Sequence, residues 1–449
     1  MNSARTERRA LDREILRLAV PALGALVAEP LFLLTDTALV GHLGAVSLAG
    51  LGIAGTILQT AIGLLIFLAY ATTPTVARRL GAGDRAGAIR AGIDGMWLAL
   101  ALGALLAVVG ALTARPLAAA FGAAPAVTDA AVEYLAIAAW GMPGMLLLIA
   151  ATGLLRGLQD TRTPLVVAIA GFTANAALNA VFIYGLGWGI AGSAAGTVVA
   201  QYGMAAVYVV MAVRAARPHG VSVRPGLAGV SASAAAGGWL LLRTASLRLG
   251  MIAFTVVGAA LGTEELAALQ VSMALLSLVA FVLDAEAIAA QAMVGHALGA
   301  GDHGRVRTVV RRLIQHTVLA GLGSGLILAA LAPVAGRAFT SDPAVLAMLP
   351  GLMLVLAVTA PLAGYVFVLD GILIGAGDAR YLALTGLANV IVYLPSLMLA
   401  LVPPEGGLAA VLLAQGAWSL VYLAARAVTL GLRARGERWM TTGAARDAS

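Results

Sequence analysis

The sequence predicts an all-α integral membrane protein with twelve transmembrane helices, arranged as two parallel six-helix repeats around a central cavity. Three observations support this fold class. Hydrophobic residues make up 61% of the 449 residues and charged residues only 11%, less than half the charged share of a typical soluble domain. Long apolar stretches alternate with short polar breaks, as in proteins that cross a membrane many times. Short motifs of the first half also recur in the second half.

The apolar stretches define the predicted helices in order. A basic segment from Arg5 to Arg17 precedes an apolar stretch that continues to Val40. We expect a retained first helix, because this stretch lacks the short apolar region and small-residue cleavage site of a signal peptide. The predicted spans are 15–40, 46–77, 91–113, 127–151, 164–186, 190–213, 236–260, 265–295, 309–334, 346–374, 381–402 and 408–432.

The basic residues, all arginine, orient these spans. Except for Arg115, Arg243, Arg248 and Arg337, every arginine lies near a chain end or beside an even-numbered loop. The positive-inside rule makes that side cytoplasmic, so both termini, including the one that carries Arg446, are predicted to be cytoplasmic. The net charge of +7 then reflects topology and contact with membrane lipid rather than nucleic-acid binding. We expect a multi-pass protein of a bacterial plasma membrane.

An internal repeat divides the chain into a predicted N-terminal lobe, 1–225, and a C-terminal lobe, 226–449. An even number of helices in each lobe gives both copies the same orientation, as in transporters built from parallel repeats. The repeated Gly-Ala-Gly-Asp sequence predicts a tight turn between helices. It lacks the lysine and the preceding strand of a phosphate-binding loop. The matching segments are 80–84 and 298–302, 157–160 and 375–378, and 200–201 and 414–415.

Longer motifs occur in a characteristic order along nearly the whole chain. They are Thr35–Gly44, the two Leu-Gly-Ala-Gly-Asp loops, Gly153–Thr161, Asn175–Asn179, Gly189–Thr197, Leu241–Thr244 and Leu369–Leu373. In order and spacing the chain resembles the multidrug and toxic compound extrusion (MATE) family, in its DinF-like branch. The resemblance implies a secondary antiporter that exports small amphipathic, often cationic compounds, and we expect the protein to act as a monomer. Its coupling ion would be H⁺ or Na⁺, and it would need no other cofactor.

Polar residues inside the predicted first lobe are candidates for the coupling site. Glu29 and Asp36 lie seven residues apart on nearly one face of the first helix. Asn175, Asn179 and Thr197 are predicted at the depth of Asp36 in the fifth and sixth helices. Acids in hydrocarbon are costly and face protein or water-filled cavities. These oxygen-bearing side chains therefore predict a cation or proton site, and the alternative is that Asp36 caps a helix end.

The family resemblance indicates the same positions. In many relatives the position of Asn179 holds a second aspartate. The asparagine removes one negative charge, which weakens the case for tight sodium binding and favours protonation of Asp36. The counterparts of Asp36 and Thr197 in the second half are Phe254 and Val411, so the fold itself does not require the site.

Two prolines, Pro21 and Pro30, interrupt the backbone hydrogen bonds of the first helix and predict that it can bend. We hypothesise that protonation of Asp36 reshapes this helix and expels the substrate. The alternative is a purely structural role for both prolines.

The second half carries its own intramembrane charges, which are Arg243, Arg248, Asp284, Glu286 and Asp370. Helix geometry predicts similar depths for Arg248 and Asp284, and for Arg243 and Asp370. The set is either a structural ion-pair network or a second coupling path.

Further polar and aromatic side chains are candidates for lining the cavity, although aromatic residues near the membrane interface more often act as anchors. They are Glu133, Tyr134, Gln201 and Tyr202, together with Glu29.

Other functions fit the sequence less well. A lipid-linked precursor flippase shares the architecture but commonly has a strongly basic cavity. A membrane-embedded enzyme would need a catalytic motif, and none is present. The five histidines lack the spacing of metal ligands, and the chain has no cysteine, so no metal site is expected.

Overall fold

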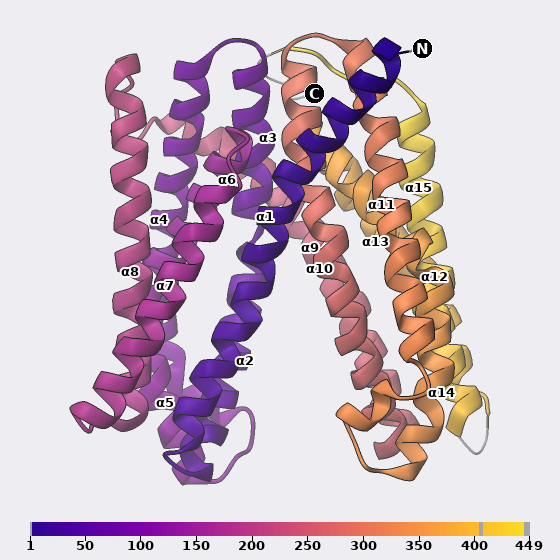
Figure 1. Ribbon diagram of the computed structural model, residues 1–449. Coiled ribbons are helices and arrows are strands. Elements are labelled where there is room, and N and C mark those ends of the chain that lie inside the picture. The colour runs from indigo at the N-terminus through magenta and orange to yellow at the C-terminus, as the bar shows by residue number, and fades with distance from the viewer. Residues whose placement is uncertain (1, 404–406, 444–449) are drawn as a thin grey trace. The chain divides into compact units, whose positions relative to one another are not determined.

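The computed structural model describes residues 2–403 and 407–443, and within these ranges it is built of helices and short connections (Figure 1). Within these described residues, twelve helical segments are long and apolar enough to cross a membrane, which confirms the predicted number. Helices are the expected solution, because backbone polar groups in hydrocarbon must find their partners within the same segment. Arg446, which supported the predicted orientation, lies outside the described residues.

The helices of the first half follow one another with short loops. They are α1 (Asn2–Gly41), α2 (Ala45–Leu65), α3 (Phe67–Gly81), α4 (Arg85–Ala119), α5 (Pro125–Ala138), η1 (Ala139–Gly141), α6 (Met142–Gly157), α7 (Arg162–Ala180), η2 (Val181–Gly185), α8 (Gly189–Ala216) and η3 (Arg217–His219).

The helices of the second half repeat this order. They are α9 (Leu227–Leu261), α10 (Thr263–Gly299), α11 (His303–Leu331), η4 (Ala335–Ala338), α12 (Pro343–Gly375), α13 (Ala379–Met398), η5 (Leu399–Leu401), α14 (Gly407–Gly416), η6 (Ala417–Tyr422) and α15 (Leu423–Arg435).

Most helices extend beyond the predicted spans, because capping starts them close to the loops. The Asp84 side chain accepts a hydrogen bond from the backbone N–H of Gly87 at 2.7 Å, and the Asp302 side chain accepts one from Arg305 at 2.8 Å. Such caps satisfy N–H groups that have no partner within the helix. The preceding glycines, Gly83 and Gly301, have φ of 79° and 73°. The predicted tight turns are therefore confirmed.

The chain divides into two compact units. The first unit comprises Val20–Gly237, and the second comprises Gly238–Thr442 together with the N-terminal residues up to Ala19. Helix α1 therefore contributes its first part to the second unit and the remainder to the first. In the first unit α4 and α3 pack on α6, and α7 packs on α8; in the second, α10 and α11 pack on α12 (Figure 1).

Each unit has its own apolar core. The core of the first unit gathers side chains from α1, α2, α4, α5 and α8, with Val40 and Tyr134 among its buried members. The core of the second unit contains an aromatic cluster in which Trp418 contacts Phe254, Tyr393 and Tyr422. These cores leave a buried polar position in each unit, described below.

A strained turn residue gives a first prediction. Gln159 is the only described non-glycine residue with a positive φ, 63°, and its counterpart in the repeat is Gly377 with φ 72°. The left-handed backbone costs a residue with a side chain about 1–2 kcal/mol. Glycine avoids this cost but loses more backbone entropy on folding, which is unfavourable by about 0.5–1 kcal/mol. Gln159→Gly should therefore stabilise the protein by about 1 kcal/mol, measured as a higher thermal unfolding midpoint in detergent. The reciprocal control Gly377→Gln should lower the midpoint. A lower midpoint for Gln159→Gly would contradict the argument.

Candidate functional site

Three helices bring the predicted polar residues of the first unit together. Asp36 lies on α1, Asn175 and Asn179 lie one turn apart on α7, and Thr197 lies on α8. Asp36, Asn175 and Asn179 are all at most 5% exposed, so these polar groups depend on one another for hydrogen bonds. Thr197 is half-buried at the edge of the cluster.

A chain of hydrogen bonds connects the four predicted residues. The Asn179 amide N–H donates to Oδ1 of Asp36 at 2.8 Å and to Oδ1 of Asn175 at 3.1 Å. The Asn175 amide donates to the Thr197 hydroxyl at 3.1 Å. The predicted proximity of these side chains is therefore seen in the structure, and Asp36 is the only ionisable group among them.

Sequence reasoning missed one member of the cluster. The hydroxyl of Ser193 on α8 donates to Oδ1 of Asp36 at 2.6 Å, and Ser193 is fully buried. A signal was present, because Ser193 precedes Thr197 by four residues and so shares its helix face. The buried Tyr134 hydroxyl lies close to Thr197 and Ser193 and within electrostatic range of Asp36. Tyr134, predicted to line a cavity, thus belongs to the surroundings of this cluster.

The backbone next to the cluster departs from regular α-helix. The segment η2, immediately after Asn179 on the same span, is a π-helix, a form often found at functional sites. On the facing helix, a Cβ at Gly196 would lie 2.1 Å from Oδ1 of Asn179. Glycine at this position is what allows α8 to approach α7 closely enough for Asn175 to reach Thr197.

Asp36 is buried without a basic partner. Its described contacts are hydrogen bonds from two neutral groups, and no salt bridge within the described chain includes it. A buried, isolated carboxylate is unfavourable by many kcal/mol, so the group is stable when it carries a proton or faces a bound cation. This arrangement can therefore take up and release a positive charge.

The other predicted residues of the first unit lie apart from this cluster. Glu29 is half-buried on α1, whereas Glu133 is exposed on α5. Tyr202 is also exposed and donates a hydrogen bond to the backbone of Trp140 at 2.8 Å. Gln201 is half-buried where α8 meets Gly141. None of these four side chains donates or accepts a described hydrogen bond with Asp36.

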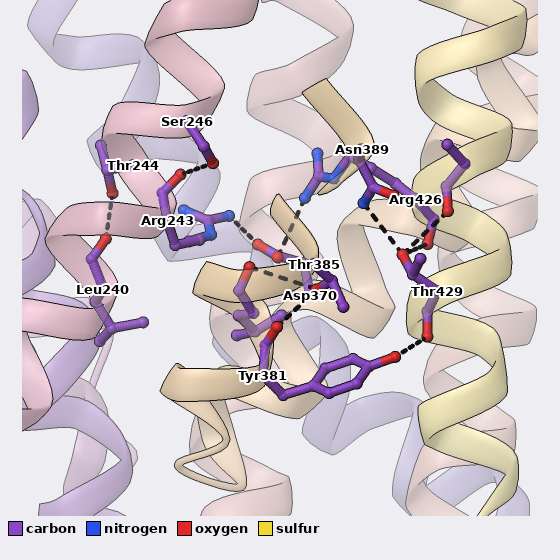
Figure 2. Close-up of polar contacts among 12 residues, drawn as sticks. Leu240, Arg243, Thr244, Ser246, Asp370, Tyr381, Thr385, Asn389, Arg426 and Thr429 are labelled. Atoms are coloured by element: carbon purple, nitrogen blue, oxygen red, sulfur yellow. Dashed lines mark hydrogen bonds and ion pairs between the residues drawn. The ribbon is translucent and has the colours of Figure 1, made fainter. Parts of the chain in front are cut away.

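The buried polar position of the second unit is an ion-pair network (Figure 2). Asp370 on α12 pairs with Arg243 on α9, as helix geometry predicted, and also with Arg426 on α15 at 3.1 Å. The three side chains are 9–12% exposed. A small cavity with room for about one water molecule lies beside them, lined also by Thr385 and Asn389.

The sequence misplaced one arginine of this network. The sequence places Arg426 near the chain end, among the arginines that orient the helices, but the structure directs it inward to Asp370. Because Arg426 lies two turns before the polar end of α15, its position alone did not distinguish an interfacial from a buried side chain. Arg248 is exposed, and within the described residues it forms no ion pair with Asp284. Glu286 is buried on α10. Within the described residues, no salt bridge of 4 Å or less includes its carboxylate.

Twelve membrane-length helices in the described part of the chain, in two units that each bury acidic side chains, define a multi-pass membrane protein. The MatE family model matches residues 21–181 and 241–399, one match in each half. The chain belongs to this family and is a DinF-like member of it, which confirms the resemblance seen in its motifs. It is thus a member of the MATE multidrug efflux transporters, a family of transporters rather than enzymes.

Several relatives are similar over most of their length. "Protein DETOXIFICATION 44, chloroplastic" of Arabidopsis thaliana is 28% identical, with 92% of this chain and 80% of the relative covered. "DNA damage-inducible protein F" of Escherichia coli is 29% identical, with 69% of each chain covered. "Probable multidrug resistance protein NorM" of Thermotoga maritima is 25% identical, covering 75% of this chain and 74% of the relative.

Solved structures share the fold. A MATE transporter of Vibrio cholerae, VcmN, superposes with a TM-score of 0.87 at 21% identity, covering 97% of this chain and 99% of the other. An outward-facing multidrug resistance MATE transporter of the MOP superfamily gives a TM-score of 0.85 at 20% identity, covering 96% and 97%. At such identities the similarity establishes the fold.

A close helix approach gives a second prediction. Gly196→Ala should displace the Asn179 amide from Asp36 and destabilise the protein by about 2 kcal/mol, the usual cost of overpacking. Gly203→Ala is the matched control on α8, because a Cβ there meets nothing within 4 Å. The control should stabilise the helix by up to about 1 kcal/mol. Thermal unfolding in detergent measures both variants, and equal losses in both would contradict the role of Gly196.

The ion-pair network gives a third prediction. Asp370→Asn leaves the guanidinium groups of Arg243 and Arg426 buried without their shared counter-charge and should destabilise the protein by about 3 kcal/mol. Asp129→Asn breaks an exposed pair with Arg115, whose side chains are 61% and 68% exposed, and should cost about 0–1 kcal/mol. Thermal unfolding in detergent again measures the difference. If Asp370→Asn were as stable as the wild type, the network would not act as a structural ion pair.

Proposed function

We propose that this protein exports small amphipathic, cationic compounds in exchange for protons, by alternating access. It would act as a monomer in the plasma membrane of a bacterium, with both termini in the cytoplasm. The six-helix lobes 1–225 and 226–449 would be the parts that move. The coupling group in this proposal is Asp36, supported by Asn175, Asn179, Thr197 and Ser193.

The observation that carries the proposal is the burial of Asp36 among neutral partners. Its side chain is 5% exposed and accepts hydrogen bonds from Asn179 and Ser193. Neither partner compensates a full negative charge. A proton or a cationic ligand can do so, and competition between the two for Asp36 would link proton entry to substrate release.

The orientation of Asn179 favours the proton over sodium. Its amide directs an N–H group toward Asp36, which places a donor where a sodium ion would need an oxygen ligand. A cation prefers several oxygen ligands at once, so sodium binding would require the amide to turn. A protonated Asp36 keeps the observed arrangement, because one oxygen can still accept from Asn179 and Ser193 while the other carries the proton.

Helix α1 provides a physical link from this site to a larger change. Pro21 and Pro30 lie within one continuous helix that ends just beyond Asp36. Each removes one backbone hydrogen bond and weakens the helix locally. A change in the hydrogen bonds of Asp36 would therefore be transmitted as a bend at these prolines. The family members named above include efflux proteins, and the alternative of a lipid-linked precursor flippase is not favoured.

The decisive experiment is dye export by the purified protein in liposomes, with a pH gradient and a sodium gradient imposed separately. The wild type should export a cationic dye when the pH gradient is present, and Asp36→Asn should bind the dye but not export it. Asp129→Asn, the same substitution at an exposed position, is the matched control and should export normally. Full proton-driven export by Asp36→Asn would refute the assignment. Export driven by sodium alone would show that the site binds that ion.

A further inference from the structure

A cavity of about 580 Å³ lies on the second unit, between α11 and the chain that follows α15. Its lining includes three arginines, which are Arg307, Arg311 and Arg435, and apolar side chains, among them Ile314 and Trp439. The volume is within the range of about 300–1,000 Å³ in which proteins commonly hold small ligands. We call this cavity the α11 groove. Its residues belong to neither of the polar positions described above.

The α11 face of the groove changes from basic to apolar along the helix. Arg307 and Arg311 lie one turn apart near the start of α11, and Ile314 lies about one turn further on, so the three share a face. Because α11 runs from the arginine-rich loop into an apolar span, the guanidinium groups lie toward the membrane surface and the apolar side chain lies deeper. A ligand that fits this order has a charged end and an apolar end.

The rest of the groove is formed by a folded segment after α15. This helix ends at Arg435, and the chain then turns back so that Trp439 is only 1% exposed. The Trp439 indole N–H donates to the backbone oxygen of Ala434 at 3.2 Å, and the backbone N–H of Met440 donates to that of Glu437 at 2.9 Å. The groove therefore exists without a ligand, which lowers the entropy lost on binding.

The arginines of the groove carry more charge than their neighbours offset. Arg307 pairs with Glu437. No ion pair in the described part of the chain includes Arg311 or Arg435, and both are exposed. Guanidinium groups bind phosphate oxygens through two parallel N–H hydrogen bonds. The groove thus offers two guanidinium groups to a phosphate beside an apolar surface.

The internal repeat shows that the fold does not require these arginines. In the register of the repeated loops, Ile89 and Ile93 on α4 occupy the positions of the two groove arginines of α11, and both isoleucines are buried. In the first unit the chain that follows α8 also binds to α4, where the Trp97 indole N–H donates to the backbone oxygen of Val223 at 2.8 Å. The two arginines on this face are therefore a feature of the second unit alone.

We propose that the α11 groove binds the headgroup of an anionic glycerophospholipid. Its phosphate would lie at Arg311 and Arg435, and its glycerol and first acyl carbons would lie against Ile314 and Trp439. Basic pockets at the ends of membrane helices are suited to anionic head groups. A free phosphate ion would use the arginines but leave the apolar lining in water, so the lining favours the lipid. The site is separate from Asp36 and independent of the coupling ion.

Native mass spectrometry of the whole chain in a neutral detergent tests the site by counting bound lipids. Phosphatidylglycerol and phosphatidylcholine with the same acyl chains would be titrated separately. The wild type should bind one phosphatidylglycerol at least about tenfold more tightly than phosphatidylcholine, because two arginines favour the anionic headgroup. Arg311→Gln combined with Arg435→Gln should remove this preference. Equal affinity of the wild type for both lipids would overturn the proposal.

A matched control removes the same charge elsewhere. Arg85→Gln combined with Arg214→Gln changes two exposed arginines of the first unit and should keep the full preference for phosphatidylglycerol. An equal loss of preference in the two double variants would mean that overall charge, rather than the α11 groove, attracts the lipid, and would overturn the site.

A gain of affinity separates this site from a folding defect. Glu437→Gln removes the carboxylate that pairs with Arg307 and should tighten phosphatidylglycerol binding about threefold or more, while phosphatidylcholine binding stays unchanged. Asp129→Asn, which frees an exposed arginine of the first unit, should leave both affinities unchanged. A Glu437→Gln variant that binds phosphatidylglycerol no more tightly than the wild type would contradict the assignment.

Competition distinguishes a lipid from a soluble anion. Inorganic phosphate and glycerol 3-phosphate carry the charge without the acyl chains, so they should displace phosphatidylglycerol at least about tenfold less effectively than a second anionic phospholipid does. Ile314→Asn keeps the charge of the groove and should weaken phosphatidylglycerol binding, because the apolar contact is lost. If inorganic phosphate competes as well as the lipid, the groove is a site for a soluble phosphate and the lipid assignment is wrong.

Discussion

A polar group in hydrocarbon is costly unless it finds a partner, and this cost shapes the protein at each level. The backbone meets it by forming helices. Buried hydroxyl groups meet it by bonding to the preceding turn, as Thr72 does to the carbonyl of Leu68 and Thr317 to that of Leu313. Side chains that cannot be satisfied within their own helix are brought together from different helices. Asp36 receives partners from α7 and α8, and Asp370 receives them from α9 and α15.

The two acids are stabilised in different ways, and the difference indicates different roles. Asp36 receives hydrogen bonds from neutral groups and keeps an uncompensated charge. Asp370 is shared by Arg243 and Arg426, so its charge is more than balanced. An acid with neutral neighbours keeps a charge that a proton or a bound cation can offset, whereas the charge of an acid between two guanidinium groups is already offset. The chain thus combines a group suited to exchange with a group suited to structural support.

The internal repeat shows how one backbone arrangement supports two chemistries. In the register set by the repeated Ala-Gln pair, Asn179 corresponds to Tyr393, and Asp36 corresponds to Phe254 in the register of the repeated loops. Trp418 packs against both Phe254 and Tyr393 in the aromatic core of the second unit. The position that is polar in the first unit is therefore apolar in the second. The helix arrangement places these side chains close together in either case, and the residue types determine whether the position is a polar cluster or an apolar packing site.

The sequence by itself determined the number of helices, the tight turns of the repeated loops and the family, because hydropathy, capping residues and motif order are local properties of the chain. It also indicated that Asp36, Asn175, Asn179 and Thr197 belong together, since helix periodicity fixes their faces and depths. Only the tertiary structure showed that Ser193 completes the hydrogen bonds of Asp36, that Arg426 turns inward to Asp370, and that Asp12 reaches His316. These contacts join helices whose relative rotation depends on close packing, and no periodicity along a single helix encodes that rotation.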